Sequence, residues 1–201
     1  MTLSLAGLGS QLHVIDAAYD SSNPEQQAIW DNNPGARMLP PWPEAPLGSV
    51  EAYTATVRRL IPSLNAIWGP VMELEVEHST KLTPEGKVID KMSDAESRLL
   101  RQTTKSHAQE FAAIKVPVLS VFCIHDGHDF LSQEYMTAEQ QAEVLAYFDM
   151  TRTPFTRRWI EQFRRLVPHA RTLVIENGHH YCFLKQEEVV FQEMKEFLLE
   201  A

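Results

Sequence analysis

The sequence predicts an α/β fold in which helices flank a parallel sheet, and three observations support it. Residues 116–124 are almost entirely apolar, as is typical of a strand covered on both faces. A second short apolar run follows at residues 170–175. Segments with helical periodicity separate and follow these runs, and such alternation is typical of α/β proteins. With 201 residues, 44% of them hydrophobic, the chain is long enough for one domain with an inserted subdomain.

Turn and cap signals divide the first half of the chain. Its proline-rich part predicts irregular backbone, with a turn at residues 33–35. Pro62 ends a helical pattern, and Ser93 with Glu96 forms a capping box that opens a longer one. The predicted elements are the end of a helix at 2–8 with Gly9 as its C-cap signal, a buried strand at 12–18, irregular backbone at 19–48, a helix at 50–61, a charged loop or hairpin at 73–90, and a helix at 93–114 with Leu99, Leu100, Phe111 and Ile114 as its apolar positions.

Similar signals divide the second half. Thr137 with Gln140 forms another capping box, and Thr153 with Pro154 has the pattern of an N-cap followed by a proline at the first helical position. Pro168 ends the helix that begins there. The predicted elements are helices at 137–149 and 153–166, a strand at 170–175, a turn at Asn177 and Gly178, and a last helix at 187–199 with Val190, Met194, Phe197 and Leu198 on one face.

Acids and histidines follow the two predicted strands, and in a parallel sheet functional residues gather at the carboxyl ends of strands. An acid on one strand end and an imidazole on the next can form half of a hydrolytic triad. The acid fixes the tautomer of the histidine, which then acts as a general base. The residues concerned are His125, Asp126, His128 and Asp129 after the first strand, and His179 and His180 after the second.

These segments resemble the C-terminal part of the α/β-hydrolase superfamily. Residues 114–119 are similar to its next-to-last strand, residues 167–180 to its last strand and catalytic histidine loop, and residues 14–20 to the strand before its cap. The resemblance implies a partial α/β-hydrolase fold, with Asp126 as the catalytic acid and His180 as the catalytic histidine. The implied parts are the hydrolase core at 1–20, a helical cap or lid at 21–112, and the C-terminal part of the core at 113–201.

The nucleophile of this family lies in a Gly-x-Ser-x-Gly motif, which the sequence does not contain. Residues 7–10 lack the final glycine and the preceding strand, so neither Ser10 nor Ser4 is expected to be the nucleophile. The resemblance places the motif upstream of Met1, and we expect a truncated chain. It implies a serine-type hydrolase of ester or amide bonds that needs no cofactor and is inactive as this chain. The alternative is a non-catalytic remnant that binds a small apolar ligand or a protein partner.

Other roles stay open for the same residues. Asp129 is the second candidate for the acid, and Asp126 is then only a turn residue. We expect His179 to be a loop residue, and His125 and His128 to be partly exposed turn residues. A zinc hydrolase that uses all six acids and histidines is a third alternative, although their spacing matches no metal motif. The tryptophans are expected to be packing residues, with Trp42 and Trp68 also suited to an apolar pocket; the four are Trp30, Trp42, Trp68 and Trp159.

Composition limits the partners. The net charge of −9 argues against nucleic acid, because no basic stripe is available to neutralise phosphates. Cys123 and Cys182 are expected to be reduced, buried thiols.

No stretch is long and apolar enough for a membrane span, and the N-terminus lacks the basic region of a secretory signal, so we expect a cytoplasmic protein. The expected partners are a small apolar ester- or amide-like substrate and, through an exposed sheet edge, a second copy of the chain.

Overall fold

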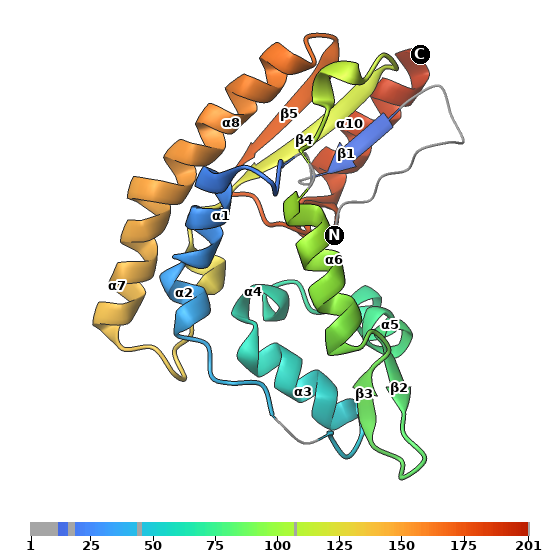
Figure 1. Ribbon diagram of the computed structural model, residues 1–201, viewed down its shortest axis with the longest axis vertical. Coiled ribbons are helices and arrows are strands. Elements are labelled where there is room, and N and C mark those ends of the chain that lie inside the picture. Colours follow the sequence, from blue (N-terminus) through green and yellow to red (C-terminus); the bar gives the residue numbers. More distant parts are fainter. Residues whose placement is uncertain (1–11, 16–18, 44–45, 107, 201) are drawn as a thin grey trace.

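The computed structural model describes residues 12–15, 19–43, 46–106 and 108–200. A three-stranded parallel sheet with flanking helices lies at one end of the molecule, and shorter helices with a two-stranded hairpin lie at the other (Figure 1). The predicted mixed α/β class is confirmed at this level.

The strands are β1 (Leu12–Ile15), β2 (Thr80–Leu82), β3 (Val88–Asp90), β4 (Val118–Ile124) and β5 (Ala170–Glu176). The helices before β4 are α1 (Pro24–Asp31), α2 (Pro34–Arg37), α3 (Val50–Leu60), α4 (Pro62–Asn65), α5 (Pro70–Ser79), α6 (Asp94–Ser106) and the short turn η1 (Phe111–Ala113). Those after β4 are the short turn η2 (His128–Phe130), α7 (Ala138–Tyr147), the π-helical turn η3 (Phe148–Arg152), α8 (Thr153–Leu166), α9 (Cys182–Lys185) and α10 (Glu187–Glu200).

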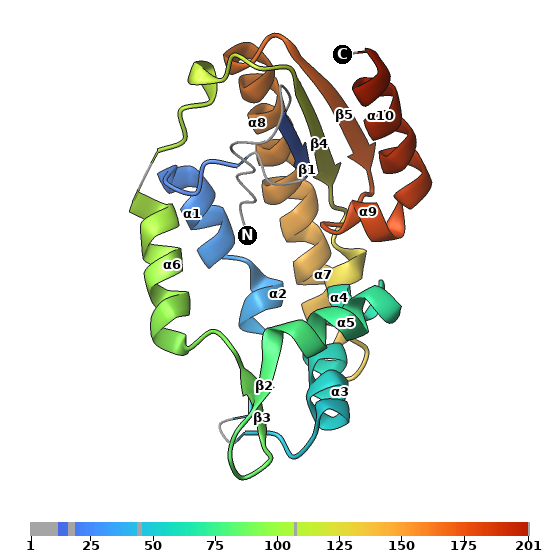
Figure 2. The same cartoon turned by 90° about the vertical axis from the view of Figure 1, so that its right-hand side faces the viewer.

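β4 lies in the middle of the parallel sheet, with β1 on one side and β5 on the other. Val118 pairs with Leu12 of β1 and with Ala170 of β5. Successive side chains of a strand point to opposite faces, so β4 contributes to two separate cores. Figure 2 shows α8 and α10 on opposite faces of this sheet. Val118, Phe122 and Ile124 pack with Phe155, Trp159 and Phe163 of α8, whereas Leu119, Val121 and Cys123 pack with Val190 and Phe197 of α10.

The α10 core also holds Cys182, and both cysteines are buried thiols, as predicted. In α10 itself the predicted face is only partly correct. Val190 and Phe197 are buried, whereas Leu198 is exposed to solvent.

The two helices predicted after β4 are present as α7 and α8, and the π-helical turn η3 joins them without a break. The capping box of Thr137 and Gln140 opens α7, as predicted. Thr153, however, has helical backbone angles, and its Oγ1 donates to the carbonyl oxygen of His125 at 3.1 Å. Pro154 has no N–H with which to continue a regular α-helix, and the π-helical turn just before it accommodates this loss. The predicted helix at 153–166 is confirmed as α8, whereas the N-cap role predicted for Thr153 is wrong.

The predicted helix at 93–114 is too long. Its capping box is present, since Ser93 N–H donates to Glu96 Oε2 at 2.7 Å and Glu96 N–H donates to Ser93 Oγ. However, α6 ends at Ser106, and Phe111 lies beyond it in η1. The ring of Phe111 packs on Trp159 and Phe163 in the α8 core, and this burial of apolar surface favours its position outside α6.

Two helices occupy the stretch predicted to be irregular. Asn23 caps α1 and Asn33 caps α2 through their side-chain oxygens, and a proline follows each asparagine at the first helical position. The Asn-Pro pair at residues 33–34 is therefore a helix start, not the predicted turn. The ion pair between Glu25 and Arg158 and the hydrogen bond from Tyr147 to the Ile29 carbonyl hold α1 beside α7 and α8.

The elements α3, α5 and β3 form a small core of their own. It consists of Tyr53, Val57, Val76 and Val88, and the Tyr53 hydroxyl donates to Asp90 at the end of β3. The hairpin β2–β3 lies within the segment 73–90 that was predicted as a loop or hairpin. The end of this segment is thus confirmed, whereas its beginning is the second half of α5.

The described residues include part of the predicted N-terminal elements. The predicted strand at 12–18 is observed over Leu12–Ile15, and residues 16–18 lie outside the described part. The predicted helix at 2–8 and its Gly9 cap also lie outside it. The boundaries of the three predicted parts, 1–20, 21–112 and 113–201, stay predictions. None of the helices in the described ranges is long and apolar enough to cross a membrane.

Candidate functional site

The loops that follow β4 and β5 meet at the carboxyl edge of the sheet. The two strands are parallel neighbours, and in Figure 2 both point toward α9 and α4. The backbone N–H of Gly178 donates to the carbonyl oxygen of Ile124 at 3.0 Å. This bond ties the first residues of one loop to the end of the other strand, as the sequence position of the two polar clusters predicts.

Glycines permit the close approach of these loops. A Cβ on Gly178 would lie 2.9 Å from the Cβ of Cys123 and 2.9 Å from the Ile175 carbonyl oxygen, closer than any ordinary contact. Gly127, in the other loop, has a φ of +89°, and a Cβ there would meet the ring of Phe148. A larger residue at Gly178 would push its loop away from the end of β4, and one at Gly127 would push the other loop away from η3.

Asp126 lies in the first loop with its carboxylate on His128. Its Oδ1 accepts the backbone N–H of His128 at 3.0 Å, and its Oδ2 lies 3.3 Å from Nδ1 of the same residue. Both side chains are solvent-exposed. The prediction that His128 is an exposed turn residue is therefore confirmed, whereas His125 is buried, contrary to its prediction, because it lies against the ring of Phe130.

His180 is exposed at the surface of the second loop. Its ring stands edge-on to that of Tyr181, with 5.0 Å between the ring centroids. An exposed imidazole next to the carboxyl edge of a sheet is accessible to a substrate. The pairing of His180 with Asp126 stays a prediction.

His179 is almost fully buried, at 1% exposure, and both of its ring nitrogens are engaged. Nδ1 accepts the backbone N–H of Tyr181 at 2.9 Å, which leaves the ring proton on Nε2. Nε2 donates that proton to the carbonyl oxygen of Ser63 in α4, at 2.8 Å. Burial lowers the pKa of His179 below its ordinary value of 6.5, although the Ser63 carbonyl and the charge of Asp129 act to raise it. His179 is therefore a neutral imidazole with a fixed tautomer.

Asp129 lies near His179 and forms an ion pair with Lys185. The ammonium group of Lys185 is 2.7 Å from each carboxylate oxygen of Asp129, so α9 in the second loop is bound to η2 in the first. The side chain of Asp129 is 20% exposed, against 42% for Asp126. The second candidate acid is thus the more enclosed of the two.

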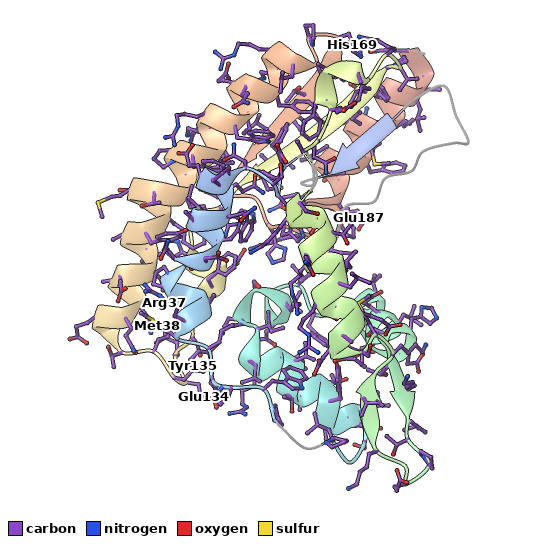
Figure 3. All side chains as sticks on the ribbon, in the orientation of Figure 1. Arg37, Met38, Glu134, Tyr135, His169 and Glu187 are labelled. Carbon is purple, nitrogen blue, oxygen red and sulfur yellow. The ribbon has the colours of Figure 1, made fainter. Side chains whose placement is uncertain are left out.

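Segments α3 and α4 dock on these loops through polar contacts. Besides the bond from His179 to Ser63, the Tyr135 hydroxyl donates to the Leu60 carbonyl at 3.4 Å. Arg59 lies 3.4 Å from Glu134, and Glu134 and Tyr135 lie on the loop that follows η2 (Figure 3). Helices of the region predicted as a cap therefore lie against the candidate site.

Metal ligation does not fit this arrangement. In the part of the chain that the structure describes, no group of three or more histidine, cysteine, aspartate or glutamate side chains is placed to share a metal ion. The zinc alternative therefore gains no support from geometry.

Sequence reasoning missed two members of the site. One is the Ser63 carbonyl, a backbone group that no sequence motif reveals. The other is Lys185, whose pairing with Asp129 depends on the fold.

Of the tryptophans, Trp159 is a buried packing residue, as predicted. Trp30 is partly exposed beneath the guanidinium of Arg152, at 4.1 Å from its ring centroid.

No family model and no curated protein matches the chain. Among solved structures, the chain is similar to a marine microorganism esterase, with 15% sequence identity and a TM-score of 0.46. The match covers 93% of this chain and 60% of the esterase, so the chain spans less than two thirds of that protein's length.

Proposed function

We propose that the loops after β4 and β5 form the acid and histidine part of a serine-type hydrolase of ester or amide bonds. The observation that carries the proposal is the hydrogen bond between Gly178 and Ile124, which holds an imidazole-bearing loop against a carboxylate-bearing loop. Such a pair can take a proton from a hydroxyl nucleophile and return it to the leaving group. The acid also precedes the histidine in the chain, which is the order expected for an α/β-hydrolase.

Asp126 and His180 are the proposed pair, and the exposure of His180 supports its role as the base. Its ring must turn from Tyr181 toward the carboxylate, and Asp126 must exchange its contact with His128 for one with the imidazole. A specific observation favours a second pair. Asp129 acts on the pKa of His179 through its charge and is less exposed than Asp126. His179 can act as the base only once its bonds to Ser63 and Tyr181 are broken.

The activity of this chain by itself is expected to be low. No Gly-x-Ser-x-Gly motif occurs among its 201 residues, so we assign no serine as the nucleophile. A histidine base next to a carboxylate can still activate water toward a reactive ester, although far less effectively than it activates a positioned serine.

Hydrolysis of 4-nitrophenyl butyrate by purified wild-type chain tests the proposal, beside the variants His180→Ala and His179→Ala. General-base catalysis contributes about 10²–10⁴-fold, so one histidine variant is expected to lose at least about tenfold of the rate above buffer. If only His180→Ala loses this rate, Asp126 and His180 are the catalytic pair. If only His179→Ala loses it, Asp129 and His179 are the pair. The control is His169→Ala, at the opposite end of the sheet (Figure 3). Equal rates in all four proteins would overturn the proposal.

A non-catalytic binding protein is the alternative function, and the state of His179 favours it. Its Nε2 donates to Ser63 and its Nδ1 accepts from Tyr181, so neither nitrogen is open to a nucleophile. For such a protein we propose self-association through β1, which is an outer strand of the sheet among the described strands. Sedimentation equilibrium that shows only monomer would contradict this association.

A further inference from the structure

A cleft of about 630 Å³ lies between the α3–α4 corner and the loop that follows η2. This volume is in the range of pockets that hold small molecules. One wall is contributed by the helices and the other by the loop, so the cleft runs along the docking contact described above. Its walls include Arg58, Arg59 and Asn65 on one side and Leu131, Gln133 and Glu134 on the other.

The cleft carries an excess of positive charge. Arg59 is partly neutralised by Glu134, 3.4 Å away. Arg58 forms no ion pair with any acidic residue in the described ranges. Its Nε donates to Asn65 Oδ1 at 2.9 Å, and its guanidinium lies over the ring of Trp68, 5.6 Å from the centroid. An uncompensated arginine in a wall of a cleft is notable in a chain with a net charge of −9.

The contacts of Arg58 suit it to bind a carboxylate. The bond to Asn65 uses only Nε, and together with the cation–π contact to Trp68 it restrains the guanidinium. The terminal nitrogens Nη1 and Nη2 then present a planar fork, which matches the two oxygens of a carboxylate. Because the side chain is already restrained, less rotamer entropy is lost when a ligand binds.

The cleft is lined by residues that neighbour members of the candidate site in the chain. Pro62 lines it, and the next residue, Ser63, accepts the hydrogen bond from His179. Leu131 lines the other wall, two residues after Asp129. A molecule whose carboxylate lies at Arg58 can therefore extend along the cleft toward the two loops.

We propose that Arg58 binds the free carboxylate of a small acyl ligand, such as a half-ester of a dicarboxylic acid. This inference rests on the proposed function, because it assigns the substrate class of the same site. It also narrows the apolar substrate expected from the sequence to one with a charged end. Glu134 contributes to the selection, because its carboxylate repels a second negative charge on the ligand.

Equilibrium binding tests the inference separately from hydrolysis. Monomethyl glutarate, a single-charge half-ester, is titrated into the 201-residue chain and its Arg58→Gln and Arg58→Lys variants by calorimetry. Charged hydrogen bonds contribute about 1.5–3 kcal/mol, so Arg58→Gln is expected to weaken binding at least about tenfold. Arg58→Lys keeps the charge but not the fork and is expected to retain part of the affinity.

Arg101→Gln is the matched control, since Arg101 is an exposed arginine on α6 and forms no ion pair within the described ranges. It is expected to leave the affinity unchanged, and added salt is expected to weaken binding to the wild type. Equal affinity for neutral dimethyl glutarate, equal loss in Arg58→Gln and Arg101→Gln, or no binding of the half-ester overturns the inference. Binding of inorganic phosphate as tight as that of the half-ester overturns the carboxylate assignment. Binding of the half-ester, together with equal rates of 4-nitrophenyl butyrate hydrolysis in wild type and both histidine variants, removes the proposed function and leaves the carboxylate site.

Discussion

The central strand β4 and the helix α6 differ in how much of each is buried in the core. All seven residues of β4 are buried between α8 and α10. No residue of α6 is buried, and Leu99 is 64% exposed. The fold of β4 is therefore determined by packing on two faces, whereas α6 depends on its capping box and on local hydrogen bonds. Apolar residues at regular spacing therefore predict that a helix or strand forms, but not that it is buried.

The largest expected effect is a loss of stability on truncating a side chain of β4, which the same change in α6 should not cause. Phe122 is fully buried and packs edge-on against Phe163, so Phe122→Ala should lower the free energy of unfolding by about 3–5 kcal/mol. Leu99→Ala should change it by no more than about 0.5 kcal/mol, because Leu99 already faces solvent. Urea unfolding of both variants measures the difference. Comparable losses would mean that α6 is packed against a surface that the described residues do not provide.

A second comparison uses two glycines. Gly178→Ala places a methyl group against Cys123 and the Ile175 carbonyl, so it should destabilise the protein by about 1–3 kcal/mol and separate the two loops of the site. Gly48→Ala is the control, because nothing lies within 4 Å of a Cβ at that position. Urea unfolding of the two variants measures the effect, and equal stability would mean that the close contact of the loops is not maintained in solution.

The third prediction concerns pH. Burial lowers the pKa of His179 below 6.5, so as the pH falls through 6.5 the unfolded chain binds a proton that the folded protein resists. The stability contributed by neutral His179 is therefore complete above this value and is lost below it. Asp129, Lys185 and His125 face the imidazole, and the charge of Asp129 moderates the effect whereas those of Lys185 and His125 increase it.

Between about pH 7.5 and about pH 5.5, the wild-type chain should lose more stability than His179→Gln. Urea unfolding at both pH values gives the two differences. The exposed His169, replaced in His169→Gln, controls for general titration of histidines. Identical pH dependence in wild type and His179→Gln would contradict a buried, neutral His179.

The smallest expected effect concerns the network of ion pairs between β5 and α10. Arg171 of β5 is bonded to three glutamates of α10, Glu193, Glu196 and Glu200. The hydrogen bond from Gln192, and after it the one from Arg171, lowers the pKa of Glu196 below 4.5. The stability that the ionised Glu196 contributes is therefore present above pH 4.5 and is lost as the pH falls through the lowered pKa. Arg171→Met should lower Tm by about 1–4 °C at low salt and by less at high salt. An unchanged Tm at low salt would show that the network does not stabilise the sheet.

Much of the core could be predicted from the sequence because its signals are local. The apolar run of β4, the capping box of Thr137 and the proline that ends the helical pattern of α3 all require only neighbouring residues. The helices α1 and α2 were missed because an Asn-Pro pair is compatible with a turn and with a helix start. Only the tertiary contacts of Ile29 and Gly35 decide between the two.

The candidate site was predictable to the level of its two loops and no further. Strand ends located both clusters of polar residues, but the sequence gives no sign of which histidine is buried. His179 is enclosed because the backbone of α4 covers it, and the position of α4 depends on the packing of distant segments. The burial of His179 is therefore a property of the tertiary fold and not of the local sequence.

The central claim is that the loops after β4 and β5 act as one site, and a double-mutant cycle on ester hydrolysis tests it most directly. Asp126→Asn and His180→Ala are compared singly and together, as are Asp129→Asn and His179→Ala. Groups that act as a unit lose little more together than singly, so in one of the two cycles the double variant should be no slower than its histidine variant. Losses that multiply in both cycles, or no loss in any variant, would contradict a shared site.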